Sequence, residues 1–415
     1  MDKTNRPSFP VDSVSILFLS LIRKEHTNSF RFSMTLREPV DPEVLQTAVD
    51  RLWHRMPSVM ACIRPGFFHY TLVQSEAPPV VRKDPGLLKT MPAEELHSCA
   101  FRVFYEENTI SIEAFHALTD GHGAITALTT LVSEYLKLKE GIAVPVSHLR
   151  LDADEAPTRE ETEDPALALA DAKPWHLPSR FSYVPPSPAD TDWRTRAVSR
   201  TWETKQLLEA AHRNGVTLNT LLTALMARAL MKQQLAREKK KYLPVRIMVP
   251  ANLRPLFGKR TLRNFSLYSL PTMEVADREL SLQELCRSFE NQIRANFTKE
   301  KLASMSSYNV RTQNAWYFRC LPWAVKGAAM RLGYRFFGES NSSLTLTNLG
   351  RVVLPEELQP HVTDMQVYMT PRATSPYGCT ILSFGDKLTV NISKFTNDRE
   401  LEELFFGELQ AAMDV

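Results

Sequence analysis

The most informative stretch for the fold of this chain is Phe115-His116-Ala117-Leu118-Thr119-Asp120-Gly121-His122-Gly123. Apolar residues precede it at every second position in 110–114, which is the pattern of a strand with one buried face. Apolar residues follow it at helical spacing in 125–136, which predicts a helix packed on one side. The most polar short segment of this region therefore lies at a strand-to-helix turn, where functional residues are often found.

Helix and strand patterns alternate outward from this turn in both directions. Before it, Asp41-Pro42 opens a predicted helix that ends at Pro57, because Asp caps free backbone N–H groups and Pro suits the first turn. Beyond residue 196 the patterns predict strands at 198–202, 245–249, 343–347, 365–369, 380–384 and 388–392, and helices at 205–213, from Thr217 and over 401–409. Helices followed by strands thus occur in two halves of similar size, which predicts an α/β protein with two similar subdomains.

A proline-rich segment separates the two halves. Eight of the 27 prolines fall between Pro145 and Pro188, among several acidic residues, which is typical of an extended connection and, for its middle part, equally of a disordered surface loop. We therefore expect an N-terminal subdomain over 1–145, a crossover linker over 146–196 and a C-terminal subdomain over 197–415.

Composition argues against several classes of protein. The 415 residues are 43% hydrophobic, enough for one large core or two medium ones, and 50 Lys+Arg against 47 Asp+Glu leave a net charge of +3, so we expect no nucleic-acid partner. Five scattered cysteines without a CxxC pair argue against a zinc ribbon or a disulfide framework and predict a cytoplasmic protein. The apolar run Val14–Ile22 is interpreted as a buried strand, because a membrane-spanning helix needs about 20 residues. No transmembrane segment is expected.

Within the turn, His116, Asp120 and Gly121 form the pattern H-x-x-x-D-G. A neutral histidine is the side chain best suited to accept a proton near pH 7. Asp120 could orient the imidazole or pair with an arginine, and Gly121 would permit a backbone conformation that other residues avoid. His122 is expected to line the pocket or to pack at the start of the helix. A metal site is disfavoured, because these potential ligands share one tight turn and no further ligand is evident.

The pattern matches the H-x-x-x-D-G signature of the acyltransferase superfamily of chloramphenicol acetyltransferase, the plant BAHD enzymes and the peptide-synthetase condensation domains. The chain most resembles the alcohol acetyltransferase and polyketide-associated acyltransferase branch. Weaker matches follow in the family's order at Leu45–Pro57, Gly215–Asn219, Val249–Arg254, Arg263–Phe265 and Thr347–Gly350. The resemblance implies two chloramphenicol-acetyltransferase-like subdomains, each a mixed β-sheet with flanking helices, with an active-site tunnel between them.

The resemblance also implies a mechanism. In this superfamily the histidine is a general base that deprotonates an acceptor hydroxyl or amine, which attacks an acyl thioester on coenzyme A or on an acyl carrier protein. The match gives this role to His116, and it makes Asp120 one half of a structural ion pair for which Arg254 is the candidate partner. The tetrahedral oxyanion also needs a hydrogen-bond donor. The candidates are Thr345, Thr347, Asn348 and Ser383.

Two departures from the family pattern affect the choice of substrate. Phe115 occupies the position of an extra histidine in condensation domains, which favours transfer from a free thioester over peptide-bond synthesis. The D-F-G-W-G motif is absent, and Ser383–Asp386 is the nearest string, which leaves the donor open. We expect a monomeric, acyl-CoA-dependent O-acyltransferase with no permanently bound cofactor. The alternative is a non-catalytic relative that binds a carrier protein or another partner.

Aromatic residues gather in Asn314–Phe318 and Trp323–Phe337. Such stripes more often pack in a core or between helices than line an acyl or alcohol pocket. Arg331–Phe337, which has two arginines between aromatic residues, resembles a membrane-surface patch only faintly. We therefore expect these segments to be largely buried.

Overall fold

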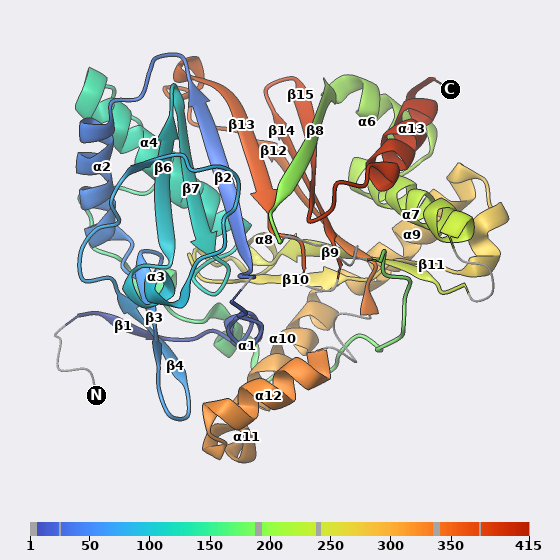
Figure 1. Cartoon of the computed structure of the whole chain (residues 1–415), viewed down its shortest axis with the longest axis horizontal. Coiled ribbons are helices and arrows are strands. Elements are labelled where there is room, and N and C mark those ends of the chain that lie inside the picture. The colour runs from blue at the N-terminus through green and yellow to red at the C-terminus, as the bar shows by residue number, and fades with distance from the viewer. Residues whose placement is uncertain are drawn as a thin grey trace.

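Two sheets, each flanked by helices, form the two lobes of the molecule (Figure 1). The computed structural model describes residues 6–24, 26–186, 193–237, 242–334, 341–372 and 375–414. The first lobe contains the turn around His116, and most of the second is built from the chain beyond residue 196. This two-lobed α/β organisation confirms the predicted fold class.

The sheet of the first lobe has the strand order β13 (Val362–Met369), β2 (Ser29–Leu36), β7 (Thr109–Phe115), β6 (Phe101–Glu106) and β5 (Arg82–Lys83). Neighbouring strands are antiparallel except β5 and β6, which are parallel. Helices α2 (Pro42–Arg55) and α4 (Gly121–Glu140) pack on each other, and α4 also contacts β2 and β7. Because β13 comes from the second half of the chain, the first lobe is completed only after the second half has been traversed. The predicted subdomain limits stay a prediction.

The sheet of the second lobe has the order β10 (Ser266–Ser269), β9 (Val245–Asn252), β12 (Leu344–Val352), β14 (Tyr377–Phe384), β15 (Lys387–Lys394) and β8 (Arg196–Glu203), and β11 (Thr272–Met273) also pairs with β9. β12 runs parallel to both β9 and β14. Helices α6 (Thr204–Arg213), α7 (Leu218–Arg237), α9 (Leu282–Asn296) and α13 (Glu400–Asp414) lie together on one side of this sheet (Figure 1).

Smaller elements complete the fold. A third sheet pairs β1 (Ser8–Pro10), β4 (Tyr70–Gln74) and β3 (Ala61–Pro65). The remaining helices are α3 (Ala93–Ser98), α5 (Arg159–Thr162), α8 (Arg254–Phe257), α10 (Lys299–Asn314), α11 (Trp316–Cys320) and α12 (Trp323–Gly333), with 3-10 turns at Pro165–Leu169, Val275–Glu279 and Gln359–His361. No helix in the described ranges is long and apolar enough to cross a membrane.

The predicted strand over Val14–Ile22 is wrong, because Ser15–Ser20 form a helix, α1. Asp12 favours the start of this helix, since its Oδ1 accepts hydrogen bonds from the backbone N–H groups two and three residues on, at 3.2 and 2.7 Å. A short continuous apolar run cannot be assigned to strand or helix by periodicity. The helix packs against α12.

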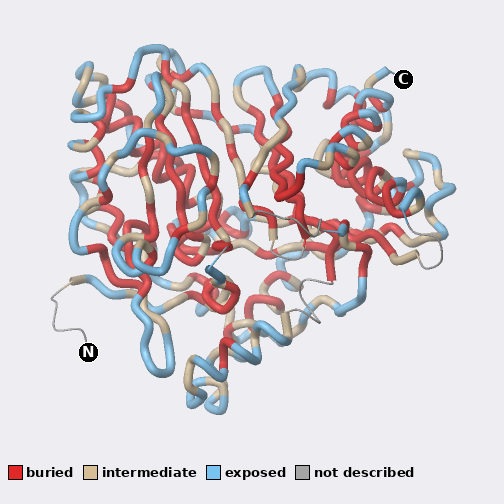
Figure 2. Tube along the Cα trace, in the orientation of Figure 1, coloured by how far each residue is buried: buried red, intermediate tan, exposed pale blue. Residues whose placement is uncertain are grey.

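Each lobe has its own buried core (Figure 2). The core of the first lobe surrounds α4 and includes the fully buried Leu128 and Phe32. It also takes Leu262 and Leu382 from the second half of the chain. The core of the second lobe lies between its sheet and the helices α7 and α13. Shared core residues and the shared strand β13 therefore join the lobes.

Local sequence explains where the principal helices begin and end. Asp41 caps α2 as predicted, with Oδ1 accepting hydrogen bonds from the N–H groups of Glu43 (2.9 Å) and Val44 (3.2 Å), and Pro42 occupies the first turn. Helix α4 ends at Gly141, whose φ of 73° lies in the left-handed region that glycine adopts without strain.

Candidate active site

His116 lies directly after the last residue of β7, where the chain turns towards α4. Its backbone N–H donates to the carbonyl of Asn28, just before β2, at 2.8 Å, so the neighbouring strand fixes its position. Asp120 then caps α4, because its Oδ1 accepts a hydrogen bond from the N–H of Gly123 at 3.1 Å. The structure thus contains the strand, turn and helix that the sequence predicts at this position.

Asp120 and Arg254 form a buried ion pair between the two halves of the chain. Arg254 Nη1 lies 2.8 Å from Asp120 Oδ2, and the two side chains are only 4% and 5% exposed. The same oxygen accepts a hydrogen bond from the backbone N–H of Phe265 at 2.8 Å. Burial alone would raise the pKa of Asp120, but Arg254 and these hydrogen bonds hold it below its ordinary value. The carboxylate is therefore charged at neutral pH.

Arg254 also holds the loop between α8 and β10. Its Nε donates to the carbonyl of Thr261 at 2.8 Å, and its Nη2 donates to the carbonyl of Arg263 at 2.6 Å. From the other side, the hydroxyl of Thr119 donates to the carbonyl of Leu262 at 2.6 Å. One guanidinium therefore connects the turn of the first lobe to a loop of the second half, and its planar fork of donors suits this arrangement.

Asn264, in this loop, contacts the imidazole of His116. Its Oδ1 lies 3.1 Å from His116 Nδ1. Its Nδ2 lies 2.9 Å from the backbone carbonyl of His116, 3.1 Å from Ser15 Oγ and 3.3 Å from Asp12 Oδ2. A backbone carbonyl only accepts hydrogen bonds, so the amide nitrogen faces it and Oδ1 faces the ring. Nδ1 therefore carries the proton, and Nε2 is left with its lone pair.

The remaining surroundings of His116 keep the imidazole neutral. Phe18 of α1 stacks on the ring, with centroids 4.2 Å apart and planes at 18°, and Phe30 of β2 meets it edge-on at 5.0 Å. Burial lowers the pKa of His116, against hydrogen bonding and the charges of Asp120 and Asp12, which act to raise it. Within the described ranges, Nε2 makes no hydrogen bond. The ring thus presents an unprotonated nitrogen.

Two glycines in the turn allow close packing between segments. A Cβ atom at Gly121 would lie 3.1 Å from Leu349 Cδ2, and the φ angle of Gly121 is outside the left-handed region, so the expected special backbone conformation is not found there. A Cβ atom at Gly123 would lie 2.1 Å from Thr119 Oγ1 and 2.5 Å from the carbonyl oxygen of Leu262, distances that real side chains do not reach. Gly123 therefore has no room for a side chain, whereas at Gly121 a Cβ atom would be in tight contact with the end of the Leu349 side chain.

The expected oxyanion donors lie on strands of the second lobe, with Thr345, Thr347 and Asn348 on β12 and Ser383 on β14. The contact of Leu349 with Gly121 shows that β12 reaches the start of α4. Asn348 Oδ1 accepts a hydrogen bond from the N–H of Gly350 at 2.8 Å, which shapes the strand locally. In the part of the chain that the structure describes, none of these candidates hydrogen-bonds to the turn, and their role stays a prediction.

His122 lies at the start of α4 beside the ion pair. Burial and the charge of Arg254 lower its pKa to about 4, against the opposing charge of Asp120, so the side chain is neutral near pH 7. It is half-buried. No hydrogen bond or ring contact joins it to His116 among the described residues, and its predicted place in the pocket lining stays a prediction.

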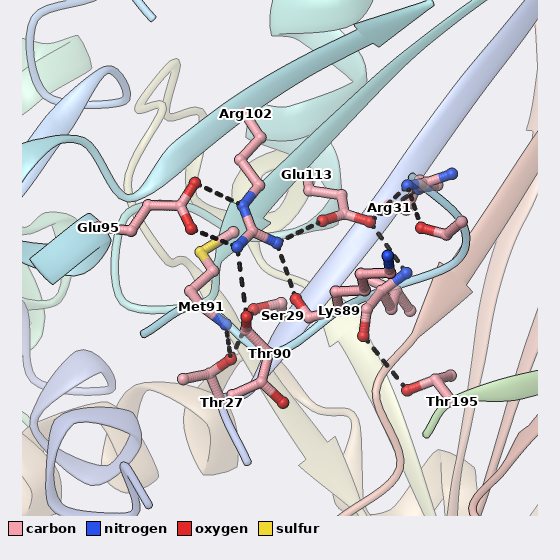
Figure 3. Close-up of polar contacts among 12 residues, drawn as sticks. Thr27, Ser29, Arg31, Lys89, Thr90, Met91, Glu95, Arg102, Glu113 and Thr195 are labelled. Carbon is pink, nitrogen blue, oxygen red and sulfur yellow. Dashed lines mark hydrogen bonds and ion pairs between the residues drawn. The ribbon is translucent and has the colours of Figure 1, made fainter. Parts of the chain in front are cut away.

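A buried network of charges holds the strand that leads into the turn (Figure 3). Glu113 of β7 accepts hydrogen bonds from two arginines. Arg31 Nε of β2 lies 2.8 Å from its Oε1, and Arg102 Nη1 of β6 lies 3.1 Å from its Oε2. Arg102 Nε also donates to Oε1 of Glu95 in α3 at 2.8 Å, and Arg31 Nη1 also donates to Asp84 Oδ2 at 2.6 Å. Because each buried charge has an opposite partner, the network fixes the relative position of three strands.

A cavity of about 770 Å³ lies close to this network, between segments 85–90 and 193–197, the second of which leads into β8. Across it, the hydroxyl of Thr195 donates to the carbonyl of Leu88 at 3.5 Å. His116 does not line this cavity. A tunnel that reaches His116 therefore stays a prediction.

Three residues around His116 were not predicted as parts of the site, namely Asn264, Phe18 and Phe30. Asn264 lies within Arg263–Phe265, a segment that carries part of the family resemblance, so a polar side chain there was a usable signal. Phe18 could not be found, because its segment was assigned to a strand. Phe30 carries no signal in the sequence, since only the pairing of β2 with β7 brings it to the ring.

A family model matches part of the chain. Residues 191–313 match a family described as phthiocerol/phthiodiolone dimycocerosyl transferase C-terminus. No curated protein sequence matches the chain.

Several solved structures are similar over nearly the whole chain. F. sporotrichioides TRI101 in complex with coenzyme A and T-2 is 12% identical, with a TM-score of 0.63, covering 95% of this chain and 96% of that one. Polyketide synthase associated protein 5 from Mycobacterium tuberculosis is 12% identical, with a TM-score of 0.59, covering 98% and 97%. The epimerization domain of the third module of tyrocidine synthetase B is 11% identical, with a TM-score of 0.58, covering 100% and 99%. These matches establish the fold and confirm the resemblance drawn from the sequence.

Proposed function

We propose that this chain, which has the fold of the chloramphenicol-acetyltransferase-like superfamily, transfers an acyl group from acyl-CoA to an acceptor hydroxyl, with His116 as general base. The observation that carries the proposal is the amide of Asn264, which places the ring proton on Nδ1 and leaves Nε2 unprotonated. The match to a transferase family and the coenzyme A bound to TRI101 support acyl transfer from a thioester. An amine acceptor is less favoured, and a carrier-bound donor is the alternative to free coenzyme A.

The proposed reaction needs no covalent enzyme intermediate. His116 Nε2 takes the proton of the acceptor hydroxyl as its oxygen bonds to the thioester carbonyl carbon. The tetrahedral intermediate then collapses, the C–S bond breaks, and the thiolate leaves with the proton returned from Nε2. Such a base contributes about 10²–10⁴-fold in rate, and alignment of the two substrates can supply roughly 7–11 kcal/mol of the barrier.

Asp120 and Arg254 have a supporting role in this proposal. Both oxygens of the carboxylate are occupied by the start of α4, the guanidinium and the loop before β10. They therefore position the turn and the loop that carries Asn264, and they do not take part in proton transfer. The monomer expected from the sequence stays a prediction.

The direct test is release of free thiol from a panel of acyl-CoAs, with and without pooled alcohols and amines. Acceptor-dependent release is expected, and alcohols should be preferred over amines. If no acyl-CoA releases thiol, the same assay with acyl carrier protein thioesters decides between a carrier-bound donor and a non-catalytic binding module. Acceptor-independent hydrolysis alone would contradict the proposal.

The pH dependence of the reaction follows from the environment of His116. A general base works only when it is unprotonated, so kcat/KM falls as pH drops through its pKa. Burial lowers this pKa below the ordinary value of 6.5, and we therefore expect the acid limb to have its midpoint below pH 6.5 and the rate to be flat above it. A midpoint above 6.5, measured with an acceptor that does not titrate in this range, would contradict the assignment.

We expect Asn264→Ala to lower kcat by roughly tenfold to a hundredfold, by analogy with the loss of a partner that orients a metal-ligating histidine. Without Oδ1 of Asn264, the imidazole is free to carry its proton on Nε2, and a protonated Nε2 cannot act as a base. The readout is kcat for thiol release, measured beside Asn314→Ala, an exposed asparagine at the end of α10. Equal kcat in the wild type and Asn264→Ala would remove Asn264 from the site.

A further inference from the structure

The edge of the molecule formed by the β3–β4 hairpin tip and by α11 and α12 carries exposed aromatic side chains. Figure 1 shows these elements projecting together at one end of the structure. Trp316 is 77% exposed, Phe67 72% and Tyr317 58%. The expectation that this aromatic segment is buried is wrong for Trp316 and Tyr317, and Arg335–Phe337 lie outside the described residues. We call Phe67, Phe68, Trp316, Tyr317, Val325 and Leu332 the aromatic edge.

The hairpin and the helices of this edge are joined to each other. The backbone N–H of Trp323 donates to the carbonyl of Phe67 at 2.8 Å, and Lys326 Nζ donates to the carbonyl of Phe68 at 3.0 Å. The rings of Tyr70 and Trp323 meet edge-on with centroids 4.6 Å apart. The exposed rings are therefore mounted on a connected support, and they face outward while the polar groups beneath them are satisfied.

Arginines and one buried lysine lie in the segments that carry the aromatic edge. Between Arg311 and Tyr334 the sequence has four lysines and arginines and no aspartate or glutamate, and Arg64 is the only lysine, arginine or acidic residue in 58–75. Within the described part of the chain, Arg64, Arg319 and Arg331 make no ion pair. Burial lowers the pKa of His69 in the hairpin tip, and the positive charges of Lys326 and Arg319 lower it further. Because the whole chain has a net charge of only +3, this edge is a local concentration of positive charge.

We propose that the aromatic edge binds the surface of an anionic lipid bilayer. Trp and Tyr are the side chains that favour the boundary between water and hydrocarbon, and nearby Lys and Arg attract anionic headgroups. The exposed side chains are on a hairpin tip and helix surfaces that project from the molecule, so they can enter a lipid interface without a change of fold. An acidic protein is the alternative partner, and the experiment below distinguishes it from an anionic bilayer.

Binding at this edge would also fix the orientation of the proposed active site relative to the lipid surface. Helix α12 packs on α1, and the side chain of Arg331 donates to the carbonyl of Ser20 at 3.4 Å. Phe18 of α1 stacks on the ring of His116. The lipid surface would therefore lie on the side of the molecule where α1 covers the imidazole. The proposal itself does not depend on acyl transfer.

The test is co-sedimentation of the full chain with vesicles of phosphatidylcholine alone and of an equal mixture of phosphatidylcholine and phosphatidylserine. We expect salt-sensitive binding to the mixed vesicles and weaker binding to phosphatidylcholine. Arg64→Gln with Arg319→Gln should weaken binding about twenty-five-fold, at about fivefold for each cation near the surface. Phe67→Ser with Trp316→Ser and Tyr317→Ser should weaken it at least about tenfold, through loss of apolar contact.

Matched controls carry the same kinds of change on other exposed surfaces. Lys205→Gln with Arg399→Gln removes two exposed cations, and Phe181→Ser with Leu208→Ser removes two exposed apolar side chains. Both controls should bind mixed vesicles as the wild type does. His116→Ala should also bind them normally, so failure of this proposal and failure of the proposed function are distinguishable.

Three results would overturn the proposal. The first is the absence of binding to mixed vesicles. The second is equal binding by the wild type and both edge variants, or equal loss in the control variants. The third is retention of the chain by an immobilised acidic acyl carrier protein without any binding to vesicles, which would assign the edge to a protein partner.

Discussion

His116→Ala is expected to lower acceptor-dependent thiol release by about 10²–10⁴-fold while the protein stays folded. The variant removes Nε2, the unprotonated nitrogen that faces no partner in the described structure, and leaves the ion pair beneath it in place. Alignment of the substrates does not depend on this side chain, so residual activity above the uncatalysed rate is expected. The measurement is kcat/KM for the preferred acyl-CoA and acceptor.

A surface histidine supplies the control for this prediction. His97, in the last turn of α3, is exposed, and His97→Ala should leave kcat/KM unchanged. Circular dichroism and melting temperature should match the wild type in both variants. If His116→Ala keeps full turnover with a genuine acceptor, the general-base assignment is wrong, whatever the outcome for the fold.

Arg254→Ala is expected to destabilise the protein by about 3–5 kcal/mol, because it leaves the buried carboxylate of Asp120 without its partner. The same change releases the loop carbonyls that the guanidinium holds, so the contact of Asn264 with the imidazole is weakened as well. Asp120→Ala should have a comparable effect on stability. The readout is the melting temperature, with activity measured on the fraction that remains folded. Stability should suffer more than the chemistry does.

An exposed ion pair provides the comparison. Arg159 and Glu163 are 86% and 51% exposed, and Arg159→Ala should change stability by no more than about 1 kcal/mol. The double variant Asp120→Asn with Arg254→Met should cost less than the sum of its single changes, because no uncompensated charge remains. Unchanged melting temperatures in both Asp120→Ala and Arg254→Ala would contradict the structural role of the pair.

Much of the fold could be predicted because local patterns agree with the final structure. The helix opened by Asp41 and the antiparallel strands before His116 carry the periodicity and capping residues of the elements that they form. The strand predicted over Val14–Ile22 is wrong because a short apolar run is compatible with both a strand and a helix. The structure contains a helix there, which packs against α12. The strand β13 joins the first lobe through long-range pairing, and no local pattern reports that partner.

The candidate site also has features that local sequence predicts and features that depend on tertiary contacts. The order of residues in the turn was enough to predict His116 at a strand end and a helix directly after Asp120, because both depend on neighbours in sequence. Arg254 was a candidate partner of Asp120 only through the family resemblance. The tautomer of the imidazole depends on the amide of Asn264, which lies 148 residues further along the chain. Such contacts exist only after both halves have folded against each other, since the distances that define them are set by packing and not by sequence spacing.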